Sequence, residues 1–181
     1  MTISQTEFSG LPLALFILQE VSKQAINCTV VPANRTPPIE EYPVVTYNIV
    51  IPETETTGDW LEDERQYTSV VQLDVHSTRQ LEAMTLSQSL CEALHDTGYI
   101  RFFKQVNILP QQITNVSNRT VLTAENYDQD FGFDCSFLIN GTKKYDTSQL
   151  DFEYSKTDIL SAHGVNLLEG DTFDASKSDK N

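Results

Sequence analysis

The sequence lacks the short motifs that usually carry enzymatic chemistry. It contains no G-x-S-x-G segment and no G-x-G-x-x-G or G-K-[ST] loop, and its seven glycines are scattered along the chain. Its three cysteines, Cys28, Cys91 and Cys135, lie far apart and form no C-x-x-C pair. We therefore expect a protein that is not an enzyme, with no catalytic residue and no cofactor. The cysteines are expected to be small, reduced, buried side chains.

Metal-binding spacing is also missing. His76, His95 and His163 follow no H-x-x-x-H or H-E-x-x-H pattern. The acidic runs at 62–64 and 128–130 lack the alternating spacing and the distal glutamate of a calcium loop. The sequence therefore predicts no metal site, histidines at surfaces or interfaces, and acidic runs that form solvated faces.

Long apolar runs and an excess of positive charge are lacking too. No stretch approaches the roughly 18 apolar residues of a membrane-spanning helix, and the run from Leu11 to Leu18 lacks the basic flank of a signal peptide. We therefore expect a protein that is cytoplasmic where it is made and has no membrane partner. The net charge is −14 and no third of the chain is net basic, so the sequence predicts no grip on nucleic acid phosphates. An acidic wall would still let DNA pass without sticking.

What the sequence does contain is a clear succession of helical and strand periods. Apolar residues at helical spacing predict a helix over 11–26, and the proline-rich stretch that follows predicts an extended segment within 27–43. Period-two alternation then predicts strands over 43–51 and 67–76. The economical interpretation of these two strands is a hairpin with a long excursion at its tip.

A second helix is expected after the hairpin. Ser77 and Gln80 fit a capping box for its start, and Gly98 would end it. Strand patterns follow at about 99–109 and 113–123.

The clearest late strand covers 130–139, where three phenylalanines share one face. Their burial predicts a place in the interior of the sheet. Beyond Asn140 the pattern loosens, with room for one more strand in 145–160 and a polar tail over 169–181.

The excursion at 52–66 carries six carboxylates and the one tryptophan, Trp60. Tryptophan dominates many interface hot spots, so Trp60 could anchor this loop in a neighbouring subunit. Alternatively, it folds back onto the protein's own sheet.

Three segments resemble the phage neck and tail terminator family. They are EYPVVTYNIV (41–50), VVQLDVHSTRQLEAMTLSQSLCEAL (70–94) and NYDQDFGFDCSFLI (126–139), and the order of elements agrees over about residues 10–140. The chain departs from the family at 128–130, where Asp-Gln-Asp stands in place of a basic residue found in many relatives.

The resemblance implies an α/β (α+β) fold, a single mostly antiparallel or mixed sheet of about four to five strands backed by two helices, with extended loops. It implies a terminator-like domain over 1–140 and a C-terminal extension or arm over 141–181. Such subunits close into rings, commonly hexameric, at the neck of the virion. The ring caps the tail tube and meets the tail tube protein on one side. On the other it meets a head-proximal connector or head-completion protein, and the genome DNA passes through its lumen.

The sequence is also compatible with two other functions. One is a different ring-forming virion protein, either a head-completion or a tail-tube protein. The other is a small soluble hydrolase or ligand-binding domain, which would need a pocket with converging polar groups.

Overall fold

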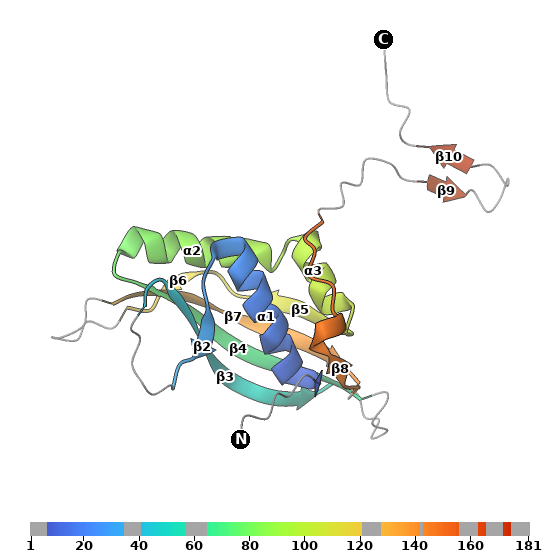
Figure 1. The fold of residues 1–181 in the computed structure, drawn as a ribbon, viewed down its shortest axis with the longest axis horizontal. Coiled ribbons are helices and arrows are strands. Elements are labelled where there is room, and N and C mark those ends of the chain that lie inside the picture. Colours follow the sequence, from blue (N-terminus) through green and yellow to red (C-terminus); the bar gives the residue numbers. More distant parts are fainter. Residues whose placement is uncertain are drawn as a thin grey trace, which may run out of the picture.

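Three helices cover a twisted sheet in the computed structural model of the chain (Figure 1). The structure describes residues 7–34, 41–56, 65–120, 128–141, 143–155, 163–165 and 172–174. The main sheet has six strands in the order β2-β3-β4-β7-β5, and β6 pairs with β7 off this path. All pairs are antiparallel except β2 with β3. The expected fold class, α+β with one mostly antiparallel sheet, is confirmed.

The bounds of these elements follow the chain order. The helices are α1 (Gly10–Ile26), α2 (Gln80–Ala93) and α3 (Thr97–Lys104). The strands of the main sheet are β2 (Val30–Pro32), β3 (Val44–Glu55), β4 (Gln66–Ser77), β5 (Ile108–Ile113), β6 (Ser117–Asn118) and β7 (Gln129–Asn140).

β4 and β7 form the centre of the sheet and pair along their whole lengths. The expected helix over 11–26 and the expected strands over 43–51, 67–76 and 130–139 are confirmed as α1, β3, β4 and β7. β7 lies between β4 and β5, so the prediction of an interior position is also confirmed. Alternation explains the success, because the odd-numbered apolar residues of β4 and β7 pack into the core beneath the helices. The fully buried apolar residues on β4 and β7 are Val71, Leu73, Val75, Phe133, Cys135, Phe137 and Ile139.

The hairpin of β3 and β4 is longer than the sequence predicted, and its excursion is shorter. β3 continues to Glu55 and β4 begins at Gln66, so part of the expected 52–66 loop is strand. Arg65 holds the two strands together here through ion pairs with Glu53 and Glu55. Trp60 lies outside the described residues, and the two alternatives for its role stay open.

The expected capping box at the second helix is wrong. Ser77 is still part of β4, where it pairs with Gln129, and helix α2 begins three residues later at Gln80. The Ser77 hydroxyl accepts a hydrogen bond from the Arg79 amide and donates one to Glu82, not to Gln80. Continued strand pairing therefore takes precedence over the local capping pattern.

The second helix ends before Gly98, and the strand expected at 99–109 is wrong in its first half. α2 ends at Ala93, and Gly98 lies in a further helix, α3. The Asp96 side chain caps α3 by accepting a hydrogen bond of 2.7 Å from the Gly98 amide. Tyr99, Phe102 and Phe103 have helical spacing, and burial of both phenylalanines decides for helix over strand. β5 begins only at Ile108.

Of the strand expected over 113–123, Ile113 ends β5 and pairs with Cys135, and Ser117 and Asn118 form β6. Residues 121–123 lie outside the described residues. Part of the extended segment expected within 27–43 joins the sheet as β2, which pairs in parallel with residues 45–47 of β3. The strand expected within 145–160 is present as β8 (Tyr145–Asp146), and its partner is β1 (Glu7–Phe8).

After β8 the chain makes a 3-10 turn, η1 (Thr147–Gln149), and returns across the helices. The Phe152 ring contacts Phe16 of α1 and Phe102 of α3, with ring centroids 6.0 Å and 5.3 Å apart. Of the expected polar tail, the structure describes 172–174, where β10 (Thr172–Asp174) pairs with β9 (His163–Val165). Within the described ranges, no helix has the length and apolar character needed to cross a membrane.

Candidate functional site: a buried acidic network

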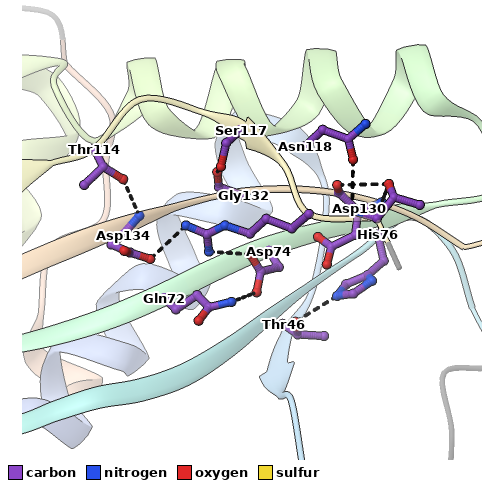
Figure 2. A network of polar contacts seen from close by, with 12 residues as sticks. Thr46, Gln72, Asp74, His76, Thr114, Ser117, Asn118, Asp130, Gly132 and Asp134 are labelled. Carbon is purple, nitrogen blue, oxygen red and sulfur yellow. Dashed lines mark hydrogen bonds and ion pairs between the residues drawn. The ribbon is translucent and has the colours of Figure 1, made fainter. Parts of the chain in front are cut away.

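The sheet face opposite the helices carries a cluster of charged and polar side chains instead of apolar ones (Figure 2). The register of β3, β4 and β7 brings them together, because Asp74 lies between Thr46 and Gly132, and His76 lies opposite Asp130. Arg119 and Asp128 join from the two ends of the segment that connects β6 to β7. We call this cluster the acidic network, and its members are Thr46, Gln72, Asp74, His76, Arg119, Asp128, Asp130 and Asp134.

Arg119 is the central cation of the network. Its guanidinium donates one hydrogen bond of 2.7 Å to Asp74 and another of 2.9 Å to Asp134. Burial alone would lower the pKa of Arg119, but the hydrogen bonds and charges of the two carboxylates outweigh burial and raise it. The Arg119 amide also donates to the Asp130 carbonyl, so the segment after β6 is tied to β7 by backbone and side chain together.

Gly132 makes room for the carboxylate that Arg119 binds. A Cβ atom at position 132 would lie 1.9 Å from Asp74 Oδ1 and 2.4 Å from the Leu73 carbonyl oxygen. Any side chain there would displace Asp74, which is only 6% exposed. The glycine therefore allows a charged group to lie flat against the middle of the sheet.

His76 connects a hydroxyl and a carboxylate. Its Nε2 lies 2.9 Å from Thr46 Oγ1, and its Nδ1 lies 2.9 Å from Asp128 Oδ2. With the proton on Nδ1 the imidazole donates to Asp128 and accepts from Thr46. Hydroxyl, imidazole and carboxylate thus follow the order of a nucleophile, its base and an orienting acid. Thr46 is only 5% exposed, however, which leaves no approach for a substrate carbonyl. The arrangement is suited to holding strands together and not to acyl transfer.

Asp130 is the carboxylate of the network whose ionised form is disfavoured by its surroundings. Burial first, and then the nearby Asp74 carboxylate, raise its pKa to about 6. One side-chain oxygen each of Asp128 and Asp130 is buried without a hydrogen-bond partner. Negative charge therefore exceeds positive charge in this cluster, and ionised Asp130 opposes folding at neutral pH.

Several sequence expectations concern these residues. His76 was expected at a surface or an interface, but its side chain is only 14% exposed and is bound on both ring nitrogens. The acidic run 128–130 was expected to be a solvated face, and this is wrong because Asp128 and Asp130 turn into the network. Arg119, 45 residues from Asp74 in sequence, supplies the positive charge beside β7. No local pattern pointed to it.

The other candidate residues lie elsewhere. His95 binds the Cys91 carbonyl oxygen at the end of α2, and the His163 side chain lies outside the described part of the structure. Cys28 and Cys135 are buried and Cys91 is half-buried, and burial raises the pKa of all three thiols, which keeps them protonated. In the described segments of the chain, no His, Cys, Asp and Glu side chains gather with the geometry of a metal site.

The family model described as phage neck terminator protein matches residues 13–164. This range runs from within α1 into β9 and includes every member of the acidic network. No curated protein matches the chain.

Proposed function

The chain belongs to the phage neck terminator protein family, and we propose that it forms a homo-oligomeric ring, a hexamer, at the head–tail interface of a tailed phage. As a member of this family it is a structural protein of the phage neck. In the proposed ring it ends the tail tube and joins it to the head-proximal connector. The observation that carries the proposal is the family match over residues 13–164.

The build of the protein supports a role in assembly. Helices cover one face of the sheet, the other face carries a network of charges, and the Thr46 hydroxyl that contacts His76 in that network is buried. The described surface instead offers exposed apolar residues on β3 and at the start of α2. The proposed partners are the tail tube protein below the ring and a connector or head-completion protein above it, with assembly in the host cytoplasm.

The negative net charge supports a role in which DNA passes the protein without being bound. With a net charge of −14 the chain repels phosphates. We propose that carboxylates line the lumen, so that the genome slides through the ring without being held. Mapping the residues that face the lumen in an assembled neck tests this point, and a lining of Lys and Arg would contradict it.

We also propose a division of labour along the chain, with 1–140 as the ring-forming domain and 141–181 as an extension that reaches neighbouring neck proteins. The part of the extension up to Tyr154 lies on α1 and α3 in this structure. A chain that ends after Tyr154 keeps these contacts. It should therefore fold normally and lose only binding to neighbouring layers, whereas loss of its self-assembly would contradict the division.

The ring itself is tested by native mass. Light scattering across a concentration series, with negative-stain images of the same sample and with and without isolated tail tubes, gives the number of copies and their arrangement. Closed rings, alone or on tube ends, are expected. Open-ended tubes would assign the chain to the tail-tube position, and a monomer that ignores tube ends would contradict the proposal.

A further inference from the structure

Two apolar patches stand out on the described surface. The first, the edge patch, consists of Ile49, Val50 and Ile51, which are 42%, 50% and 40% exposed. It lies on β3 beyond the point where β2 stops, because β2 pairs only with residues 45–47. The ladder between β3 and β4 shifts register at these residues, which turns successive side chains outward. Among the described strands none covers this edge, and an uncovered apolar edge usually has a partner.

The second patch, the helix groove, lies at the start of α2. It is a shallow hollow of about 370 Å³ lined by Arg79, Leu81, Glu82, Thr85 and Leu86. Leu81 is 69% exposed, the largest exposure of any large apolar side chain in the described part of the chain. Covering this leucine with another surface would remove apolar area from water and so favour association.

The two patches lie on different sides of the domain. In Figure 1 α2 runs along the top of the view and β3 along the bottom, with the other strands of the sheet between them. One copy of the chain cannot bring its own patches together. Two copies related by a rotation can do so, and repeating that contact generates a ring when the rotation closes on itself.

Charge favours the same pairing. Beside the edge patch Glu53 and Glu55 share the single cation Arg65, which leaves one carboxylate in excess. The helix groove carries one charge of each sign: the Glu82 carboxylate accepts a hydrogen bond from the Ser77 hydroxyl, whereas the Arg79 guanidinium makes no ion pair within the described residues. An apolar strand edge with surplus negative charge and an apolar groove with a spare guanidinium are complementary.

Pairing of two edge patches with each other is less favourable. An antiparallel contact centred on Val50 would extend only over residues 48–52, because β2 already occupies 45–47 on each copy.

We propose that the edge patch of one copy seats in the helix groove of the next copy, as the repeated head-to-tail contact of the assembly. The inference rests on the proposed ring and names the surfaces that close it. Val50 of one copy then lies close to Leu81 of its neighbour.

Cross-linking of substituted cysteines tests this contact in the full chain. A mixture of Val50→Cys and Leu81→Cys chains should give cross-linked dimers under oxidising conditions, and each variant alone should give none. A chain with both substitutions should give a ladder of covalent oligomers. The unsubstituted protein and a chain with Val50→Cys and Gln149→Cys are the controls, since Gln149 is exposed but lies in neither patch.

Each outcome is decisive. Dimers from Val50→Cys alone would show that edge patches pair with each other, and dimers from Leu81→Cys alone would show contact between helix grooves. Either result overturns the proposed contact. Rings seen by negative stain without any cross-link between positions 50 and 81 would overturn the contact and leave the proposed function standing. Absence of rings even on tail tubes would contradict both.

Discussion

On β4 and β7 the odd-numbered residues face the helices, and the even-numbered residues between them face the acidic network. Phe133 and Phe137 lie on the first face and are fully buried against apolar neighbours. Asp74 and Asp134 lie on the second and are held by one guanidinium. Burial of many apolar side chains thus stabilises one side of these two strands, whereas a few specific hydrogen bonds and ion pairs stabilise the other side. Large-to-small substitutions on the first face should be costly throughout, whereas on the second face the costly positions should be few, namely Arg119 and Gly132.

The largest loss is expected on the helix-covered face. Phe137→Ala should lower the free energy of unfolding by about 3–5 kcal/mol, because the ring is fully buried and contacts Phe103. Urea unfolding measures this loss. Ser136→Ala, one residue away on the other face, is the matched control and should change stability by less than about 1 kcal/mol. Equal losses from the two variants would remove the difference between the faces.

The next largest loss is expected at the cation of the network. Arg119→Met should cost about 2–3 kcal/mol, because Asp74 is left buried beside other carboxylates without its partner. The same unfolding assay applies. Adding Asp74→Asn to Arg119→Met should recover part of the loss, since the uncompensated charge is then gone. A variant with Arg119→Met as stable as the parent would show that the network does not hold this face.

A smaller loss of stability is expected where the segment after β8 packs on the outer side of α1 and α3. Phe152→Ala should cost about 2 kcal/mol, because the ring is only half-buried although it contacts both Phe16 and Phe102. Thermal unfolding of this variant and of the exposed control Gln149→Ala makes the comparison. An unchanged midpoint for Phe152→Ala would mean that the segment after β8 contributes nothing to the stability of the body.

The smallest effect has the opposite sign and depends on pH. The pKa of Asp130 is raised to about 6 in the fold, so folding favours its protonated form. Stability from this group is greatest at low pH and falls as pH rises from about 4 through 6. The titration responds to the other charges that face Asp130, namely Asp74, His76, Asp128 and Arg119.

Asp130→Asn should therefore stabilise the protein at pH 7 by about 1 kcal/mol, after allowance for solvent screening, and the gain should shrink towards pH 4. Urea unfolding of both proteins at several pH values measures the difference. Glu92→Gln, an exposed substitution on α2, should show no such trend. A destabilised Asp130→Asn variant at pH 7 would mean that the ionised carboxylate makes favourable contacts.

The two faces also differ in how far the sequence predicts them. The apolar face follows from period-two alternation on β4 and β7, which is local and strong. The network depends on Arg119 meeting Asp74 across 45 positions, and such a contact leaves no periodic signal. Gly132 could not be recognised as part of the network from the sequence, because its role is to leave room for the Asp74 side chain on the neighbouring strand. The sequence predicts a strand where helix α3 forms, because the spacing of its aromatic residues is compatible with both structures until burial decides between them.

Electron microscopy of particles made by a phage that lacks this chain tests the central claim most directly. A protein that ends the tail tube and joins it to the head should leave filled heads without tails when it is absent, beside free tail tubes of irregular length. Supplying the chain from a plasmid should restore joined particles of uniform tail length. Normal, joined particles in its absence would contradict the assignment to the head–tail junction.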